Sequence, residues 1–341
     1  MVYVQDIDGK PLMPTTRHGK VRRLLKANKA TVVNLCPFTI QLTYKSTDHK
    51  QPVTLGIDAG AKHIGFSATT EKEELFACET ILRTDIVDLL STRSQNRRTR
   101  RSRLRYRKPK FNNRVFSKKK GWVAPSVKQR IDSHLNEVNE IHKILPITKI
   151  VIEAAQFDTH KMKNPNISGI DYQNGEQLGF WNVREYVLFR DGHKCSYCKG
   201  KSKDPILNIH HIESRKTGGD SPSNLITLCE TCHKEYHKGN IDLKVRRGKS
   251  LCGAAIMGIM KWRLYDELKS RYSNVSMTFG YITKYNRIKY GIEKSHTSDA
   301  FVISKNFNAK RIEYQYLKRL VRRHNRQIHK MKILKGGKKK N

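Results

Sequence analysis

The chain is short of acidic residues and of long apolar runs, and each shortage excludes a class of protein. Its 341 residues contain 30 Asp and Glu against 68 Lys and Arg. No apolar run approaches the ~18 residues that a membrane span requires. The N-terminus, MVYVQDIDGK, lacks the basic and apolar regions of a signal peptide. These absences predict a cytoplasmic protein with no membrane partner.

The resulting formal net charge of +38 indicates a polyanionic partner. So many like charges repel one another in a compact chain unless a polyanion neutralises them. Nucleic acid is the natural candidate, and its binding should weaken steeply with salt. A hydrophobic fraction of 37% still suffices for real cores, and the length suggests two or three domains.

Cysteine is also sparse, and its spacing argues against a disulfide framework. Cys36, Cys78 and Cys252 are scattered, whereas the other four of the seven form two C-x-x-C pairs. Four thiolates suit a tetrahedral structural zinc in a reducing compartment. The predicted ligands are Cys195, Cys198, Cys229 and Cys232.

Three carboxylates occupy positions where a buried charge needs compensation. Asp58 lies in an apolar strand between glycines, Glu153 ends a second apolar strand, and Asp299 follows His296 by one helical turn. A buried carboxylate costs several kcal/mol unless it is compensated, commonly by a metal. Together the three would suit Mg²⁺ or Mn²⁺, which clamps a phosphodiester, while His296 takes the proton of a water molecule. Alone, Asp58 equally suits a cap on its own turn.

The segment from Arg93 to Lys110 contains eight arginines, two lysines and no acid. On a helical wheel the arginines cover more than half of the circumference, so no stripe is left to face a core. Charge runs are usually solvated, but arginine is favoured for bidentate phosphate contact. We predict a helix between nucleic-acid backbones, with contacts from Arg93, Arg97, Arg98, Arg100, Arg101, Arg103, Arg105 and Arg107.

The other elements follow from periodicity. Residues 126–145 and 251–272 are expected to be helices, and residues 275–291 are expected to be rich in strands. Residues 156–185 are interpreted as a loosely structured linker. From residue 310 the chain has 13 Lys and Arg against a single Glu, with little apolar content after Leu334.

Two nuclease types resemble these patterns. The order of strand-Asp, Arg-rich helix, strand-Glu and His-x-x-Asp resembles the RuvC-type, RNase H-like core. Residues 186–240 resemble an HNH (ββα-metal) nuclease. That resemblance implies His211 as the general base, His210 and His233 as Mg²⁺ ligands, Asn224 as the residue that orients the loop, and His237 as an extra ligand or phosphate contact. Many members carry Asp where this chain has His210. The alternative to an HNH nuclease is a four-Cys zinc knuckle whose histidines merely bind phosphate.

An HNH insert between the second and third pieces of a RuvC core resembles the IscB family, which comprises transposon-encoded RNA-guided nucleases considered ancestral to the CRISPR type II effectors. Residues 11–14 read PLMP, the motif that names the N-terminal domain of the family, and residues 280–301 match the region around its third RuvC motif. The implied fold is α/β, with an RNase H-like core split by an Arg-rich bridge helix and by a zinc-bearing HNH insert. The implied parts are a PLMP domain (1–52), RuvC part I (53–84), the bridge helix and a basic loop (85–122), RuvC part II (123–160), a linker (161–185), the HNH insert (186–245), RuvC part III (246–309) and the basic, incomplete start of a target-interaction domain (310–341).

The resemblance also implies an activity and partners. The chain would bind an omega guide RNA as a monomeric ribonucleoprotein and cleave matched double-stranded DNA. The HNH site would cut the guide-paired strand and the RuvC site the displaced strand, with Mg²⁺ or Mn²⁺ at both sites and structural Zn²⁺. One alternative is a guide-independent RuvC/HNH nuclease of the resolvase or homing type. Another is a nucleic-acid-binding transposon accessory with inactive sites, against which the presence of all expected catalytic residues argues.

Overall fold

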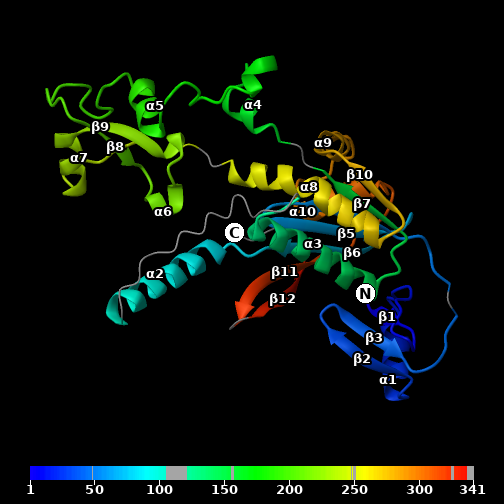
Figure 1. Cartoon of the computed structure of the whole chain (residues 1–341). Helices are drawn as coiled ribbons and strands as arrows, with labels where there is room; N and C mark the ends of the chain where they lie inside the picture. Colours follow the sequence, from blue (N-terminus) through cyan, green and yellow to red (C-terminus); the bar gives the residue numbers. More distant parts are fainter. Residues whose placement is uncertain are drawn as a thin grey trace. The chain divides into compact units, whose positions relative to one another are not determined.

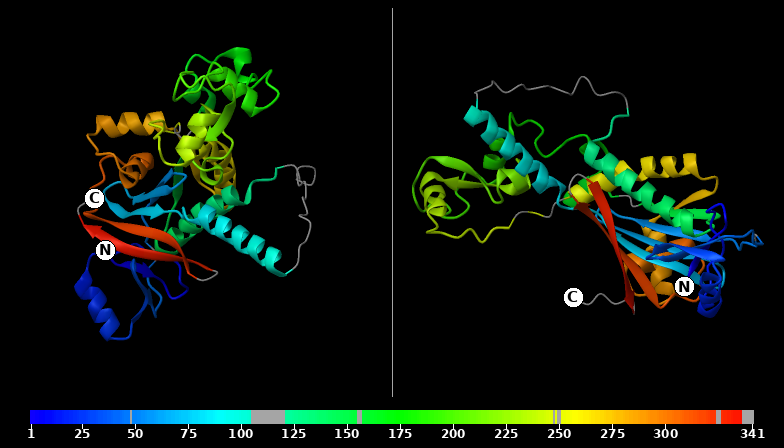
Figure 2. Two further views of the ribbon diagram at one scale, coloured as in Figure 1. Left: turned by 90° about the vertical axis from the view of Figure 1, so that its left-hand side faces the viewer. Right: turned by 90° about the horizontal axis from the view of Figure 1, so that it is seen from below.

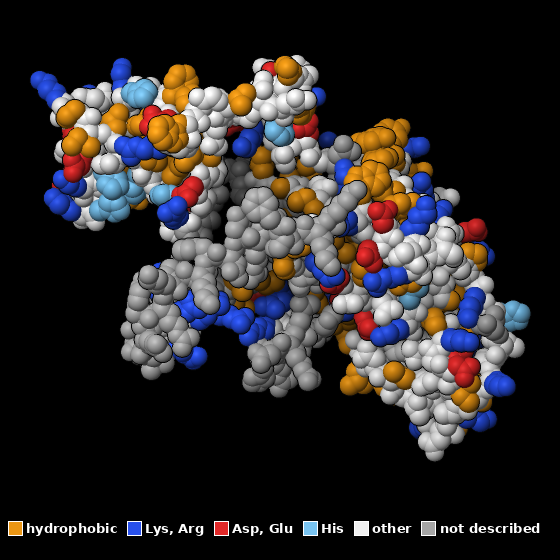
Figure 3. Space-filling view, viewed as in Figure 1, with side chains coloured by type: hydrophobic (Ala, Val, Ile, Leu, Met, Phe, Trp, Pro, Cys, Tyr) orange, Lys and Arg blue, Asp and Glu red, His pale blue; other side chains and the backbone are white. Residues whose placement is uncertain are grey.

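The computed structural model describes residues 1–47, 49–104, 121–154, 157–246, 248, 251–323 and 326–335. The chain divides into two compact units (Figure 1). Unit 1 comprises Met1–Phe157 and Cys252–Asn341, and unit 2 comprises the intervening Asp158–Leu251. Lys and Arg side chains are spread over the visible surface of both units (Figure 3). Among the described residues, no helix has the length and apolar character to cross a membrane.

A seven-stranded mixed sheet forms the centre of unit 1. Its strand order is β10-β7-β4-β5-β6-β11-β12. The bounds are β4 (Thr54–Ala59), β5 (His63–Thr69), β6 (Glu74–Ile81), β7 (Lys149–Glu153), β10 (Val275–Thr278), β11 (Tyr314–Arg323) and β12 (Arg326–Lys335). The strands β4, β5 and β6 form an antiparallel meander, whereas β7 runs parallel to β4 and β10 runs parallel to β7. The carboxyl ends of β4 and β7 therefore lie at the same edge of the sheet.

Helices cover both faces of this sheet (Figure 2). Leu55 and Ile57 of β4 belong to one buried cluster with residues of α3 (Pro125–Ile144) and α8 (Cys252–Arg271). Gly56 points to the opposite face, where its α-carbon approaches α10 (His296–Ser304). Because side chains alternate along a strand, Asp58 points to the α10 face as well.

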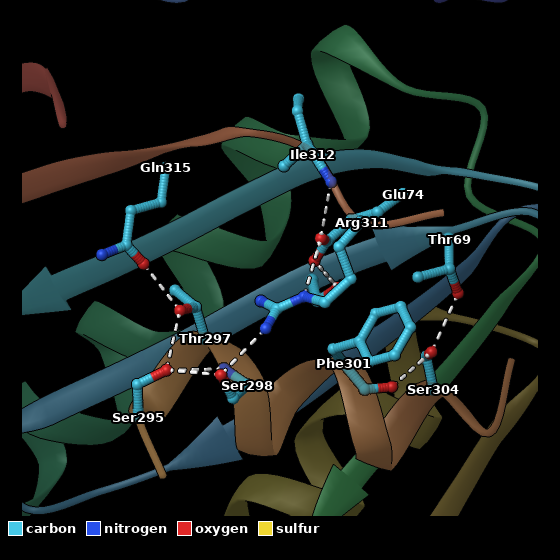
Figure 4. Close-up of polar contacts among 11 residues, drawn as sticks. Thr69, Glu74, Ser295, Thr297, Ser298, Phe301, Ser304, Arg311, Ile312 and Gln315 are labelled. Atoms are coloured by element: carbon cyan, nitrogen blue, oxygen red, sulfur yellow. Dashed lines mark hydrogen bonds and ion pairs between the residues drawn. The ribbon is translucent and has the colours of Figure 1, made fainter. Parts of the chain in front are cut away.

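A polar network anchors α10 to the strands of the sheet (Figure 4). Ser304 accepts a hydrogen bond from Thr69 at 2.9 Å, and Thr297 donates one to Gln315 at 2.6 Å. Arg311 lies between α10 and the sheet, donating to Ser298 at 3.0 Å and pairing with the buried Glu74 at 3.3 Å. The helix is thus held to the sheet near both of its ends, which fixes the residues of its first turn.

A small N-terminal layer joins unit 1. It contains a three-stranded sheet, of order β1-β3-β2, and one helix. The bounds are β1 (Tyr3–Gln5), α1 (His18–Lys26), β2 (Ala30–Leu35) and β3 (Phe38–Leu42). Tyr3 is fully buried in the main core, where its hydroxyl donates to the Leu75 carbonyl at 3.0 Å.

Unit 2 is built around a two-stranded sheet of β8 (Leu207–His211) and β9 (Leu225–Cys229). Its helices are α4 (Thr159–Lys163), α5 (Val183–Arg190), α6 (Arg215–Gly218) and α7 (Glu230–His237), with 3₁₀ turns η1 (Gly169–Tyr172) and η2 (Pro222–Asn224). Among the described residues of this unit, the buried hydrophobic cluster consists of Cys195, Ile226, Leu228, Cys229 and Cys232. A core this small, in which three of the five residues are cysteines, is typical of modules that a metal holds together.

The structure corrects three expectations. Residues 275–291 are not rich in strands, because only β10 is extended and Gly280–Lys289 forms helix α9. The segment interpreted as a linker contains α4 and η1. The basic segment after residue 310 supplies β11 and β12, and β11 pairs with β6 in the main sheet. Part of the segment expected to start a separate domain therefore extends the sheet of unit 1.

Candidate functional site

The first candidate site lies where β4 and β7 end. Ile57 pairs with Ile152 in the parallel ladder. The next residue on each strand is a carboxylate, Asp58 on β4 and Glu153 on β7, so the register places the two side by side. The first turn of α10 adds Asp299 and His296 on the face to which Asp58 points. Residues far apart in sequence thus converge as the sequence predicts.

The carboxylates lie close enough to shift the pKa values of their neighbours. Burial raises the pKa of Glu153, and the charges of Asp58 and Asp299 raise it further, against a hydrogen bond from Thr283. Burial also raises the pKa of Asp299, with Asp58 again contributing, against the charge of Arg287. Like charges held close and partly out of water are the arrangement that a divalent cation relieves.

His296 contacts this carboxylate group directly. Its Nδ1 lies 2.7 Å from Asp58 Oδ2. The His63 ring stacks on the His296 ring at a centroid distance of 5.1 Å and an interplanar angle of 5°. His63 is itself held by the buried Glu79, whose Oε1 lies 2.8 Å from His63 Nδ1. The stack fixes the plane of the His296 imidazole beside the carboxylates.

Two residues of α9 that the sequence analysis does not identify also reach this site. The Thr283 side chain is close enough to lower the pKa of the Glu153 carboxylate, while its hydroxyl donates to the Phe279 carbonyl at 3.5 Å. Arg287 Nε lies 3.0 Å from Asp299 Oδ1, in a geometry that makes an ion pair without an aligned hydrogen bond. Thr283 and Arg287 are one helical turn apart, a spacing that would have indicated a shared face if a helix had been expected here.

Two glycines make the close approach of α10 possible. A Cβ atom on Gly56 would lie 2.0 Å from the Ala300 carbonyl oxygen, and one on Gly65 would lie 1.9 Å from the His296 carbonyl oxygen. Any side chain at either position would push α10 away from β4 and β5. The glycines therefore set the distance between the His296 backbone and the sheet.

The second candidate site lies in unit 2, where β8 faces α7. His210, His233 and His237 each offer a ring nitrogen, and these three atoms lie within 4.8 Å of one another. His210 Nε2 is buried and has no hydrogen-bond partner among the residues that the structure describes. Burial, with the neighbouring His233 and His237, lowers the pKa of His210 to about 4. At neutral pH this imidazole is neutral and can offer a lone pair, so the residues fit a bound cation.

His211 and Asn224 flank this cluster. His211 Nε2 lies 2.9 Å from Asp220 Oδ1, and Arg215 holds the same carboxylate at 2.7 Å. When Nε2 donates to Asp220, Nδ1 keeps the lone pair that a general base needs. The fully buried Asn224 accepts from the Glu213 amide at 2.9 Å and donates to the carbonyls of Glu213 and Gly219. It closes the loop that carries Asp220, a residue the sequence analysis does not identify.

The four predicted cysteines come together at one end of unit 2. One sulfur from each lies within 4.8 Å of the others, which is the tetrahedral donor set that zinc prefers. Cys198 Sγ and Cys229 Sγ are 3.8 Å apart, and the Ser202 hydroxyl contacts both. The cluster could therefore hold a zinc ion.

The predicted arginine helix is present as α2 (Ile86–Leu104). Arg93, Arg97, Arg98, Arg100 and Arg101 are all exposed. A cavity of about 1050 Å³ opens beside them, lined in part by Arg93, Arg97 and Arg100, and by Arg83 and Arg322 from outside the helix. The backbone of Arg103 belongs to α2, whereas Arg105 and Arg107 lie outside the described residues.

Comparison with known proteins adds family and fold matches. Residues 2–175 match the model of the RRXRR protein family, and residues 195–239 match that of the HNH endonucleases, the metal-dependent DNA-cutting enzymes predicted from the sequence. A 67-residue segment, 19% of this chain, is 34% identical to anaredoxin of Nostoc sp. and covers 84% of that protein.

Solved structures give weaker matches. Cas9 of Streptococcus thermophilus in complex with the AGAA PAM matches 68% of this chain with a TM-score of 0.37 and 12% identity. The type II-C Cas9 of Actinomyces naeslundii matches 75% with a TM-score of 0.31 and 11% identity. The chain spans 33% and 60% of the lengths of these two proteins.

Proposed function

Since this chain belongs to the RRXRR protein family and carries an HNH endonuclease domain, we propose that it is an RNA-guided DNA endonuclease with two separate cutting sites. The two family matches confirm the predicted resemblance to an IscB-like RuvC/HNH nuclease. One observation supports the proposal that unit 1 contains a cutting site in addition to the HNH site of unit 2. Asp58, Glu153 and Asp299 come from three distant segments of unit 1 and share one charged environment beside His296.

In unit 1, Asp58, Glu153 and Asp299 would hold Mg²⁺ or Mn²⁺, which supplies Lewis-acid stabilisation of the attacking and leaving oxygens of a phosphodiester. His296 accepts the proton of the attacking water at Nε2, the nitrogen not bonded to Asp58. Asp58 and the stacked His63 keep that nitrogen oriented. These residues are a RuvC-type site on an RNase H-like sheet.

In unit 2, His210, His233 and His237 would hold a divalent cation that polarises the scissile phosphate. Three imidazoles suit a transition ion better than Mg²⁺, which prefers oxygen ligands. His211 accepts the proton of the attacking water at Nδ1, while Asp220 holds Nε2 and Asn224 holds the loop. The four cysteines hold a structural Zn²⁺ that maintains this unit.

The net charge of the chain and the arginines of α2 support the proposal of RNA guidance. A net charge of +38 needs a polyanion, and the exposed arginines of α2 present guanidinium groups suited to phosphate. Base pairing by an omega guide RNA would then supply sequence specificity, with the protein holding the heteroduplex by its backbone. The HNH site would cut the guide-paired strand and the RuvC-type site the displaced strand.

The first test is to purify the chain with its neighbouring genomic segment and sequence the RNA that remains bound. A single structured species with one variable end supports guidance and supplies the target to assay. Heterogeneous RNA that moderate salt removes would contradict it and would favour a guide-independent nuclease.

Strand-resolved cleavage of a matched duplex then tests the two sites. We expect Asp58→Ala to lower cutting of the displaced strand, and His211→Ala to lower cutting of the guide-paired strand, each by ~10²-fold or more. The exposed Asp88→Ala and His160→Ala serve as matched controls. Loss of both cuts from either single change would contradict two independent sites.

A further inference from the structure

Helix α9 exposes a row of large apolar side chains instead of burying it. Tyr281, Tyr285 and Ile288 are 72%, 65% and 64% exposed. They are spaced by four and three residues, so they form one continuous stripe, in which Lys284 is also exposed. Hydrophobic side chains gather over α9 in the space-filling view (Figure 3). A contiguous apolar stripe of this kind usually marks an interaction surface.

The opposite face of the same helix contacts the carboxylate site. Thr283 is buried and lowers the pKa of Glu153, and Arg287 pairs with Asp299 at 3.0 Å. At the start of the helix, a Cβ atom on Gly280 would lie 3.0 Å from Glu153 Oε1. A helix with its side chains is about 10–12 Å across. The exposed stripe therefore lies one helix width from the carboxylates. The two are connected by α9, which carries the stripe on one face and contacts the site with the other.

Charge and ring geometry indicate what covers the stripe. Helix α9 contains Lys284, Arg287 and Lys289 and no acidic residue, so its surroundings favour an anionic partner. At the start of the helix, the rings of Phe279 and Tyr281 lie nearly parallel, with their centroids 6.0 Å apart and an interplanar angle of 7°. Flat aromatic rings interleaved with basic groups suit single-stranded nucleic acid, in which the bases are free to stack and the phosphates are near the cations.

We propose that Tyr281 and Tyr285 form a stacking platform for bases of a single DNA strand that enters the carboxylate site. This inference rests on the proposed function, because a duplex in which one strand pairs with a guide leaves the other strand unpaired. Lys284 and Lys289 hold the phosphates between stacked nucleotides. Stacking is independent of sequence, as every base has a π-face. The platform thus positions any displaced strand for cutting, and Tyr281 and Tyr285 act as positioning residues.

The test compares Tyr281→Ala/Tyr285→Ala with Tyr281→Phe/Tyr285→Phe in the complex with the co-purified RNA, on a duplex labelled on both strands. We expect the alanine variant to cut the displaced strand about 5- to 150-fold more slowly for each lost stacking partner, with unchanged cutting of the guide-paired strand. The phenylalanine variant keeps the rings and should cut like the wild type. Trp262→Ala, which removes an exposed aromatic from α8, should have no effect.

A second measurement does not depend on guidance. An iodouracil-substituted single-stranded oligonucleotide is irradiated with the whole chain, and mass spectrometry identifies the cross-linked residues. Cross-links at Tyr281 or Tyr285 without guided cutting would refute the proposed function and leave the platform standing. Cross-links elsewhere, with wild-type cutting of both strands by the alanine variant, would overturn the platform. A molar mass in solution that differs between the alanine variant and the wild type would also overturn the platform. It would identify the stripe as an interface between two copies of the chain.

Discussion

At the scale of single residues, the two candidate sites use opposite devices to keep a cation-binding group ready. His210 is kept neutral, since burial and its histidine neighbours lower its pKa to about 4. Glu153 and Asp299 are held in the other direction, because burial and neighbouring carboxylates raise their pKa values. In the histidine site of unit 2, competition from protons is removed at neutral pH. In the carboxylate site of unit 1, the carboxylates repel one another until a cation binds.

This repulsion predicts that Glu153→Gln stabilises the metal-free chain. Because the folded-state pKa of Glu153 is raised, its contribution to the free energy of unfolding falls as pH rises from the unfolded pKa to the folded pKa, and stays low above that window. Gln carries no charge at any pH. We expect the variant to melt about 2–4 °C above the wild type at pH 7, for roughly 1 kcal/mol, with the difference vanishing below about pH 4.

Thermal melts across pH, with and without Mg²⁺, check this expectation. Added Mg²⁺ should raise the melting temperature of the wild type and leave that of the variant unchanged. Glu71→Gln, in the exposed turn between β5 and β6, is the matched control. A variant that melts below the wild type at pH 7 would mean that the bond from Thr283 outweighs the repulsion.

At the scale of elements, the position of α10 against the sheet decides whether the carboxylate site forms. We predict that Gly65→Ala displaces α10, since the new Cβ would overlap the His296 carbonyl oxygen. Overpacking of this kind costs about 1–3 kcal/mol, and here it moves a catalytic group as well. Cutting of the displaced strand should fall by ~10²-fold or more, as for loss of the base, while unit 2 keeps its activity.

Gly258→Ala is the control for this change. Gly258 lies in helix α8, and a Cβ atom there would have no neighbour within 4 Å. Alanine should therefore raise helix stability by about 0.5–1 kcal/mol without affecting either cut. Wild-type cutting by the Gly65→Ala variant would show that α10 can shift without disturbing the site.

The cysteine cluster sets the stability of unit 2, so Cys195→Ser should unfold that unit alone. The buried cluster of unit 2 is small, and structural zinc supplies about 10–16 kcal/mol in comparable modules. We expect loss of bound zinc, rapid proteolysis within residues 158–251 and loss of cutting of the guide-paired strand. The core of unit 1 should stay protected. Full cutting of the guide-paired strand by this variant would refute the zinc assignment.

Regular apolar patterns explain which elements were predictable. The helix α3 and the strands β4 and β7 each place apolar residues at the spacing of their type, and the sequence predicts them correctly. In contrast, α9 contains Tyr, Ile and Thr, which favour strands, and it contacts the site through Thr283 and Arg287 instead of an apolar stripe. A helix whose buried face is polar shows no periodic spacing of apolar residues in the sequence.

The sequence does not predict strand β11, for a related reason. Its core-facing side chains include the buried Lys318, between Tyr316 and Leu320, which interrupts the apolar alternation of a strand. Lys318 is tolerated because its ammonium lies 2.6 Å from the buried Glu137 carboxylate of α3. Pairing between residues so far apart in sequence is invisible to local periodicity. The same holds for Asp220 beside His211, which only the folded loop brings together.

At the scale of the whole molecule, the net charge of +38 predicts that a polyanion offsets the self-repulsion of the chain, and we propose that this polyanion is nucleic acid. Each phosphate contact made by a cation releases a counterion, so the logarithm of the association constant falls linearly with the logarithm of salt concentration. The steepness of this dependence is proportional to the number of phosphate groups that the protein's cations contact. It therefore distinguishes arginines that touch RNA from basic residues that only add to the field of the whole chain.

We predict that replacing Arg93, Arg97 and Arg100 by Gln lowers the steepness of this slope for the co-purified RNA by about 2–3. These three exposed side chains line one cavity beside α2. Replacing the exposed Lys199, Lys201 and Lys203 of unit 2 makes the same change in net charge. If contact matters, the lysine variant keeps the wild-type slope; if only net charge matters, both variants lose affinity equally and α2 is not the RNA-binding helix.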